Sequence, residues 1–301
     1  MDTKQIEYIL AIAEENNITR AAEKLFITQP ALNQQLLRLE KELGTPLFYR
    51  SRTNWRLTPA GEIYIANAKE MLQMKKDTYA MISDLLKQKK GYLSIAFPPG
   101  RGSDMFIHVY PVFHAEYPEI TVIPFELSVR KQMAAIASGE VDIGFQTLCR
   151  DQMPDSYYIP ICSEEMLLSI PSGHPLASGA CEGLNKAITL DISSVQYEPF
   201  VLIYKESTNR ALIDRIFEEA GVKPNILFET SRYNTITRMI QARLCCGILP
   251  EYYAKACSDG ISSFSLPGHP SWETVAAYKG GSYLSRAARR FIDLASQYWN
   301  S

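Results

Sequence analysis

The chain has 301 residues, of which 46% are hydrophobic and 21% are charged. This length excludes one small domain and this composition excludes a disordered chain, so we expect two or three compact units. The net charge of −2 is unevenly distributed, because residues 1–90 hold 14 Lys and Arg against 11 Asp and Glu, whereas the remainder holds 17 against 22. A mildly basic N-terminal part is compatible with a polyanionic partner.

The first two predicted helices are short. Ile6, Ile9, Leu10 and Ala13 follow the i, i+3, i+4, i+7 spacing that places apolar groups on one stripe of a helix. A second helix is predicted over residues 20–26, with Thr19 as its N-cap. A tight turn is expected at residues 26–28.

The third predicted helix has clear signals at both ends. Thr28 can cap it, Pro30 suits its first turn, and Gly44 supplies the left-handed residue that closes it after Leu43. Four leucines follow a 4-3-4 spacing, Leu32, Leu36, Leu39 and Leu43, and the first three are predicted to be core residues. Four polar residues are predicted to face outward: Asn33, Gln34, Arg38 and Lys41.

A short hairpin and a long helix follow. Residues 46–50 and 55–57 are predicted to form a two-stranded wing with basic residues near its tip. Thr58-Pro59 then begins a helix that nothing interrupts before Gly91. Its heptad of mainly apolar residues predicts a seam for a partner helix, most simply from a second copy. The seam positions are Ile65, Ala68, Leu72, Lys75, Tyr79, Ile82 and Leu86, widened by Met71, Met74, Met81 and Leu85.

After Gly91 the pattern changes to alternating strands and helices. Strands are predicted over 92–97, 120–126 and 141–145, with helices between them, and a second set begins near Ile161. Such alternation predicts a mainly parallel sheet covered by helices on both faces. The last element is predicted to be an amphipathic helix over 284–299.

The segment from Asn17 to Glu62 resembles the DNA-binding domain of LysR-type transcriptional regulators. The resemblance rests on many positions at the family's spacing: Ala21-Ala22, Leu25, Gln29-Pro30-Ala31-Leu32, Leu39-Glu40, Leu43-Gly44, Leu47-Phe48, Arg50, Leu57-Thr58 and Gly61. It extends in organisation to the rest of the chain, including the segment Ser138 to Gly144. We therefore expect an α + α/β protein with three parts. These are a winged helix-turn-helix (1–58), a linker helix for dimerisation (59–90), and a two-lobed effector-binding domain of periplasmic-binding-protein type (91–301).

Within that domain, lobe one is expected at about 91–160 plus 262–301, and lobe two at about 161–261. The resemblance also implies a transcriptional regulator that binds an interrupted inverted repeat of double-stranded DNA as a dimer or tetramer. It implies a small-molecule effector, and contact with RNA polymerase if the protein is an activator. Activation and repression both remain open.

Candidate DNA-binding residues lie on the third helix and the wing. Asn and Gln can pair with adenine edges in the major groove, and cations fix the register on phosphates. Gln29, Asn33 and Gln34 are the expected base readers, with Pro30 beside them and Arg38 nearer the phosphates. The wing offers Arg50, Arg52, Thr53 and Arg56. Asn33 stands where relatives commonly carry serine, so the preferred base sequence stays open.

Candidate effector-binding residues lie on loops that follow the predicted strands, where clefts of such domains bind ligands. Lobe one offers Arg101, Gly102, Ser103, Ser128, Gln146 and Thr147, and lobe two offers Tyr204, Lys205, Thr230 and Ser231. Arg101 and Lys205 suggest an anionic effector such as a carboxylate. The alternative is that each cation merely points to solvent.

Other chemistries have weaker support. The motifs GxSxG and HExxH are absent, so we expect no enzyme and no catalytic residue. The six cysteines lack CxxC spacing and there are only four histidines, so no metal site, disulfide framework or cofactor is predicted. Cys245-Cys246 leaves a redox sensor as a minor alternative to simple packing.

The remaining alternative class is a periplasmic solute receptor. The charged N-terminus carries no signal peptide pattern, and no apolar stretch approaches the roughly 18 residues of a membrane span. We therefore expect a cytoplasmic protein without membrane contact.

Overall fold

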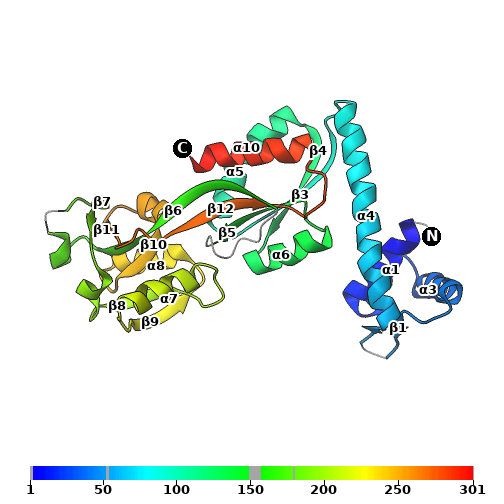
Figure 1. Cartoon of the computed structure of the whole chain (residues 1–301), viewed down its shortest axis with the longest axis horizontal. Coiled ribbons are helices and arrows are strands. Elements are labelled where there is room, and N and C mark those ends of the chain that lie inside the picture. Colours follow the sequence, from blue (N-terminus) through cyan, green and yellow to red (C-terminus); the bar gives the residue numbers. More distant parts are fainter. Residues whose placement is uncertain (1–2, 52–53, 149–156, 179, 301) are drawn as a thin grey trace. The chain divides into compact units, whose positions relative to one another are not determined.

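The computed structural model describes residues 3–51, 54–148, 157–178 and 180–300. It divides into two compact units (Figure 1). The N-terminal unit comprises residues 1–88 together with 281–285, and the C-terminal unit comprises residues 89–280 together with 286–301. Within the described residues, no helix is both long and apolar enough to cross a membrane.

Three helices form the core of the N-terminal unit: α1 (Thr3–Glu15), α2 (Ile18–Lys24) and α3 (Gln29–Leu43). Leu32, Leu36 and Leu39 are almost completely buried among them, as the leucine spacing predicts. Leu43, the fourth leucine of this spacing, has a side chain that is 45% exposed. Leu43 is the last residue of α3, so the helix carries it past the core.

The ends of α2 and α3 are fixed by local hydrogen bonds. The predicted cap of α2 was wrong: Asn17, not Thr19, is the N-cap, and its side-chain oxygen accepts from the amides of Thr19 (2.9 Å) and Arg20 (3.1 Å). Asn17 satisfies two orphan donors at once, which Thr19 inside the first turn could not do. The caps of α3 are confirmed, with Thr28 accepting from Ala31 at 3.4 Å and Gly44 left-handed at φ +71°.

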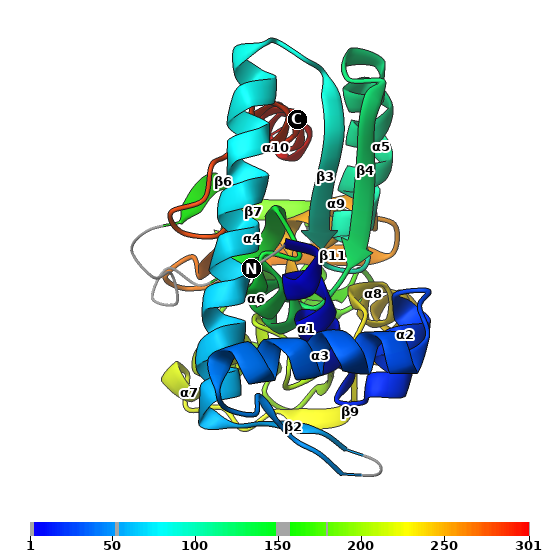
Figure 2. The same cartoon turned by 90° about the vertical axis from the view of Figure 1, so that its right-hand side faces the viewer.

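The wing consists of β1 (Phe48–Tyr49) and β2 (Arg56–Leu57), which pair antiparallel. The two strands are joined to α4 (Pro59–Leu85) through Thr58, whose Oγ1 donates to the carbonyl of Pro46 at 2.7 Å and accepts from the amide of Gly61 at 3.0 Å. Figure 2 shows the wing below α3 and beside the start of α4. The base of the hairpin is thus held to the start of α4.

Helix α4 is shorter than the sequence suggests. It ends at Leu85, because Lys87 takes a left-handed conformation (φ +53°) and the amides of Lys87 and Gln88 turn back to the carbonyls of Asp84 and Ser83. A lysine can close a helix in this way, although the sequence gives no glycine to mark the end.

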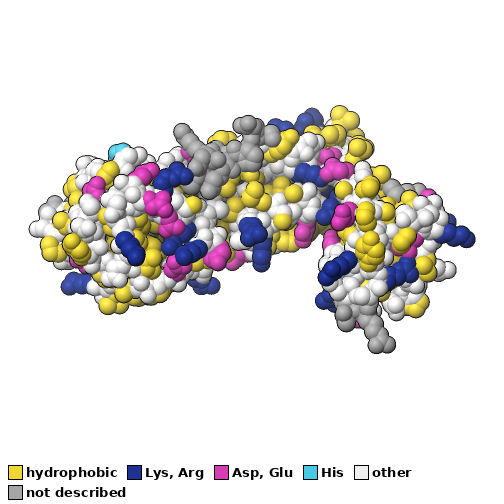
Figure 3. Space-filling view, turned by 60° about the horizontal axis from the view of Figure 1, so that its bottom comes forward, with side chains coloured by type: hydrophobic (Ala, Val, Ile, Leu, Met, Phe, Trp, Pro, Cys, Tyr) yellow, Lys and Arg dark blue, Asp and Glu magenta, His cyan; other side chains and the backbone are white. Residues whose placement is uncertain are grey.

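The apolar face of α4 has two different uses. Ile65, Ala68 and Leu72 pack against Ile6 and Leu10 of α1, so these seam positions are occupied within the unit. Further along, a stripe of exposed apolar side chains remains, which we call the α4 stripe: Met71 (45% exposed), Met74 (71%), Met81 (49%) and Leu85 (80%). Figure 3 shows hydrophobic side chains gathered on the visible face of this unit.

The C-terminal unit is built on one long sheet in the order β4-β3-β5-β12-β6-β11-β7, with β10 also paired to β6. These strands are β3 (Lys90–Phe97), β4 (Glu119–Glu126), β5 (Ile143–Leu148), β6 (Tyr158–Pro171), β7 (Gly183–Thr189), β10 (Gly247–Pro250), β11 (Ile261–Ser265) and β12 (Ser271–Ala277). A separate parallel pair is formed by β8 (Pro199–Ile203) and β9 (Asn225–Thr230).

Two lobes share this sheet through β6 and β12, as Figure 1 shows. Lobe one holds β3, β4 and β5 with α5 (Arg101–Glu116), α6 (Val129–Ser138) and α10 (Arg286–Trp299). Lobe two holds β7 to β11 with α7 (Arg210–Glu219), α8 (Tyr233–Gln241) and α9 (Glu251–Ala256). The predicted two-lobed α/β architecture is confirmed.

The prediction of a mainly parallel sheet is only partly right, because β7–β11 and β8–β9 are parallel pairs but β6 pairs antiparallel with β10 and β11 within lobe two. β3 pairs parallel with β4 and β5, but β12 pairs antiparallel with both β5 and β6. The 14 residues of β6 contribute to both lobes, pairing first with β12 and then with β10 and β11. A strand that crosses between lobes must be followed by one that returns, and the return produces the antiparallel pairs.

Candidate functional site

The outward face of α3 carries most of the predicted base readers. Gln29, Pro30, Gln34 and Arg38 are exposed, whereas Asn33 is only half-exposed. Helix α3 has its N-terminus capped by Thr28, and a helix of this kind fits the major groove with its first turns nearest the bases. The polar groups needed for base readout therefore lie free on one helix.

The wing arginines do not behave alike. Arg56 is exposed on β2, but Arg50 forms an ion pair with Glu40 and its guanidinium lies 5.6 Å from the centre of the Trp55 ring. The buried Glu40 carboxylate also accepts from the amide of Leu47 at 2.8 Å. Arg50 thus anchors the wing to α3 in this structure. Arg52 and Thr53 lie outside the described residues.

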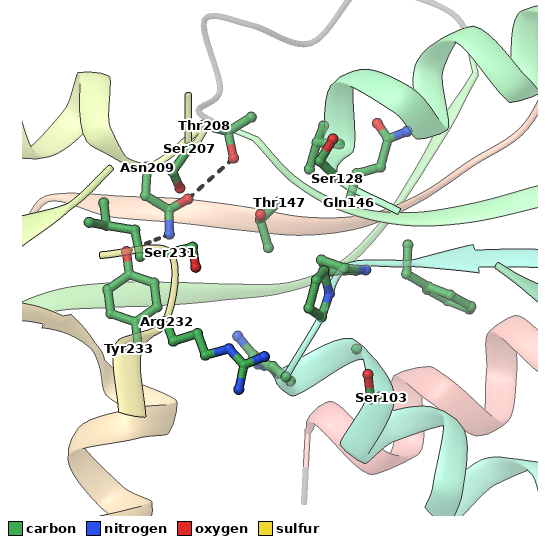
Figure 4. A pocket seen from close by; sticks show the side chains of 18 of the residues that line it. Ser103, Ser128, Gln146, Thr147, Ser207, Thr208, Asn209, Ser231, Arg232 and Tyr233 are labelled. Carbon is green, nitrogen blue, oxygen red and sulfur yellow. Dashed lines mark hydrogen bonds between the residues drawn. The ribbon is translucent and has the colours of Figure 1, made fainter. Parts of the chain in front are cut away.

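A cavity of about 540 Å³ lies between the two lobes of the C-terminal unit. This volume is typical of small-molecule sites. Eight of the ten predicted effector-binding residues line it: Arg101, Gly102, Ser103, Ser128, Gln146, Thr147, Tyr204 and Ser231. Figure 4 shows hydroxyl and amide side chains converging on it from both sides.

Four helices begin at this cavity. The N-terminal residues of α5 and α6 line it from lobe one, and those of α7 and α8 line it from lobe two. None of the four has a side-chain cap hydrogen bond at its N-terminus, and the short helix α9 also lacks one, whereas α2, α3 and α4 are all capped by a side chain. Uncapped N–H groups and the positive end of each helix dipole attract anions. The four helix N-termini therefore contribute positive potential to the cavity.

The sequence places residues 98–103 in a loop, but α5 begins at Arg101. Arg101, Gly102 and Ser103 consequently form its first turn, and their amides are the ones left without an intrahelical partner. Gly102 is required there, because a Cβ would lie 2.7 Å from Cδ of Pro98. The first turn thus lies close against the end of β3.

Arg101 is not free to attract an anion. Its side chain is buried and forms an ion pair with Glu164 on β6, and its guanidinium lies 4.9 Å from the Tyr252 ring and 5.7 Å from the Trp299 ring. Glu164 also accepts from Nε1 of Trp272 at 2.9 Å and from the amide of Tyr252 at 2.5 Å. Arg101 therefore ties lobe one to the crossing strands and to α9.

Two other predicted residues are not among the cavity-lining set. Lys205 is exposed beside the cavity. Thr230 hydrogen-bonds to two residues that line the cavity. Its carbonyl accepts from the amide of Tyr204 at 2.8 Å, and its Oγ1 accepts from the amide of Arg232 at 3.3 Å. Arg232 lines the cavity together with Arg101, and its side chain extends from lobe two into the open space in Figure 4.

Sequence reasoning missed several lining residues that lie at helix starts. Asn209 donates to the hydroxyl of Tyr233 at 2.8 Å, which connects the N-termini of α7 and α8. Burial raises the pKa of the Tyr233 hydroxyl, so it stays protonated. The signal available in the sequence was Ser207-Thr208-Asn209 directly before a helix, a run typical of an N-terminus.

Two carboxylates and one buried amide complete the lining. Glu126 and Glu206 face the cavity, and the Ser103 hydroxyl donates to Glu126 at 3.0 Å. Gln146 is 1% exposed, and both polar atoms of its side chain lack a hydrogen-bond partner. Such an amide is costly to bury unless something pairs with it. A bound molecule with both acceptor and donor groups would satisfy this amide.

The cysteines offer little support for redox chemistry. Burial raises the pKa of Cys245 to about 11 and that of Cys246 to about 12. Both thiols therefore stay protonated near neutral pH, and the thiolate is the reactive form. No group of three or more His, Cys, Asp or Glu within the described part of the chain is arranged to hold a metal ion.

Comparison with known proteins agrees with this architecture. Residues 3–62 match the family model described as bacterial regulatory helix-turn-helix protein, lysR family, and residues 87–300 match the LysR substrate binding domain. The uncharacterized HTH-type transcriptional regulator YybE of Bacillus subtilis (strain 168) is 32% identical over 254 residues, which cover 83% of each chain. The regulator AlsR of the same organism is 26% identical, over 83% of this chain and 80% of AlsR.

Solved structures share the fold. A full-length OxyR variant from Pseudomonas aeruginosa has a TM-score of 0.71 at 23% identity, covering 98% of both chains. Full-length CbnR complexed with its target DNA has a TM-score of 0.58 at 20% identity, covering 99% of both chains. The chain belongs to the LysR family of transcriptional regulators. It is a DNA-binding regulator with a small-molecule-binding domain.

Proposed function

We propose that this regulator binds an interrupted inverted repeat of double-stranded DNA and that an anionic effector between the lobes controls its output. Gln29 and Gln34 would read base edges, with Asn33 beside them and Pro30 close to the groove floor. Arg38, Arg52, Thr53 and Arg56 would contact the backbone, and Arg50 would join them only by leaving Glu40. The protein would have no catalytic role, and as an activator it would contact RNA polymerase.

The observation that carries the effector proposal is the meeting of four helix N-termini, none capped by a side chain, at one cavity. Arg232 adds a full positive charge at the cavity. Arg101 does not add another, since its charge is already balanced by Glu164. A carboxylate is the common biological anion that suits such donors. Glu126 and Glu206 favour an effector that also carries a hydroxyl or amino donor.

The DNA part is tested by selecting bound sites from a random duplex pool with the full chain. We expect an interrupted inverted repeat with the wild type, and loss of sequence preference at one position of each half-site with Gln34→Ala. A lost bidentate contact to adenine should reduce discrimination by about 1–3 kcal/mol. Gln35→Ala is the matched control, since Gln35 is half-buried on the same helix. Equal sequence preference for all three proteins would contradict this assignment of base readers.

The effector part is tested by thermal stabilisation of the full chain with a panel of small carboxylates and the matching neutral amides. We expect one or more carboxylates to stabilise the wild type, and Arg232→Met to weaken that binding about tenfold or more, because a charge-assisted hydrogen bond contributes roughly 1.5–3 kcal/mol. Lys205→Met should bind as the wild type does, since Lys205 does not line the cavity. Equal losses in both variants would show that the effect is general electrostatics rather than direct contact.

The α4 stripe is the proposed contact between two copies. Met74 is 71% exposed at its centre, so Met74→Asp should place a charge in the middle of the helix pair and convert the dimer to a monomer in sedimentation. Met74→Leu preserves the apolar surface and should remain dimeric. A dimer that persists in Met74→Asp would assign self-association to another surface.

A further inference from the structure

Phe26 closes helix α2 in an unusual way. Its backbone is left-handed (φ +55°), its amide donates to the carbonyl of Glu23 at 3.1 Å, and the amide of Ile27 donates to the carbonyl of Ala22 at 3.0 Å. This is the closing turn in which glycine, or sometimes asparagine, is the favoured residue. A bulky side chain at such a position strains the backbone.

The Phe26 ring makes no contact with the core that would offset this strain. Its side chain is 96% exposed, while the neighbouring Leu25 and Ile27 both pack against the core of the N-terminal unit. A large apolar side chain left in water contributes no burial, and its backbone conformation is the one best suited to glycine. Phenylalanine at this position therefore does not stabilise the fold, and its role is contact with another molecule.

The place of Phe26 in the fold indicates what it contacts. It lies three residues before Gln29, so the extended chain allows at most about 10 Å between their Cα atoms. If the first turn of α3 reaches base edges, Phe26 lies at the rim of the same groove, beside the sugar-phosphate backbone. The nearby cation, Lys24, forms ion pairs with Glu14 at 3.0 Å and with Glu15 at 3.4 Å. Its charge is therefore already balanced, and Phe26 offers an apolar contact to DNA at this point instead of an ionic one.

We propose that Phe26 is a DNA-contacting residue whose ring packs against a deoxyribose or a thymine methyl group at the edge of the groove that α3 enters. Apolar side chains recognise these groups by contact rather than by charge. The inference rests on the proposed placement of α3 in the major groove. It predicts opposite effects on folding and on binding, which a purely structural role cannot give.

The test compares full-length wild type with Phe26→Gly on the duplex selected by the wild type. Phe26→Gly should resist urea at least as well as the wild type, because glycine suits φ +55°, yet bind DNA about tenfold more weakly, which equals about 1.4 kcal/mol. Phe26→Leu should lie between them. The slope of log affinity against log salt should stay unchanged, whereas Arg38→Ala should reduce it by about one.

Tyr197→Ala is the control, because Tyr197 is an equally exposed aromatic residue (87%) of the C-terminal unit, and it should bind DNA normally. A Phe26→Gly variant that binds as tightly as the wild type overturns the inference, and so does one that unfolds more readily. A photo-reactive benzoylphenylalanine at position 26 should crosslink to labelled duplex, and crosslinking only to a second copy or another protein would also overturn it. Failure of the wild type itself to bind any duplex would instead refute the proposed DNA placement.

Discussion

Glu164→Leu is expected to destabilise the C-terminal unit by about 3–5 kcal/mol, the usual effect of removing one partner from a buried ion pair. The Arg101 guanidinium would remain buried without its counter-charge. Two further donors, Nε1 of Trp272 and the amide of Tyr252, would lose the acceptor that they share. Because these groups come from lobe one, from β12 and from α9, the loss should affect both lobes together.

Urea unfolding followed by tryptophan fluorescence measures this effect, since Trp272 and Trp299 both line the cavity. The paired variant Arg101→Met with Glu164→Leu is the informative control. It removes both charges, so it should recover the part of the loss that comes from the unpaired Arg101 charge, while Trp272 and Tyr252 remain without their acceptor. A single Glu164→Leu variant as stable as the wild type would show that this ion pair does not hold the lobes.

Gly61→Ala is expected to unfold the N-terminal unit and abolish DNA binding. A Cβ at Gly61 would lie 2.1 Å from the carbonyl oxygen of Leu47, a backbone atom that cannot turn aside. The start of α4 would have to move away from the segment that leads into the wing, and the bonds that Thr58 makes to Pro46 and Gly61 would break with it. We expect the free energy of unfolding to fall by more than about 3 kcal/mol, at the upper end of the cost of overpacking, because the clash is with a backbone atom.

Gly44→Ala provides the matched control for this prediction. Gly44 also belongs to the N-terminal unit and has a left-handed backbone (φ +71°), but nothing lies within 4 Å of its missing Cβ. Its replacement should therefore cost only about 1 kcal/mol of conformational strain and leave DNA binding intact. Circular dichroism melting and DNA binding at 37 °C distinguish the two variants. Equal behaviour of Gly61→Ala and Gly44→Ala would contradict the close approach seen here.

The sequence was most informative where the determining interactions are local. Thr28 and Gly44 mark the ends of α3 through hydrogen bonds and backbone conformations that span only a few residues. Local signals can still compete, as at the start of α2, where Asn17 rather than Thr19 reaches the free amides. The end of α4 carried no local signal, because a lysine occupies the left-handed position at residue 87.

The cavity shows the limit of such reasoning. Strand ends and helix starts predicted eight of its lining residues, because the alternation of strands and helices brings these loops together. The choice among cations could not be predicted. Arg101 is neutralised by Glu164, a residue 63 positions away on a crossing strand, and Arg232 faces the cavity in place of Lys205.

By itself, therefore, the sequence determined the family, the two-lobed architecture, and the helix that carries Gln29 and Gln34. The family and the two-lobed architecture follow from the resemblance to LysR-type regulators, whereas the helix depends on apolar periodicity and on caps that act over one or two turns. Only the tertiary structure decided which arginines are free, which apolar residues of α4 remain exposed, and that four uncapped helices meet at one cavity. Each of these depends on contacts between segments far apart in the chain. A charged side chain or an apolar face is available for function only when no distant residue of the same chain pairs with it or packs against it.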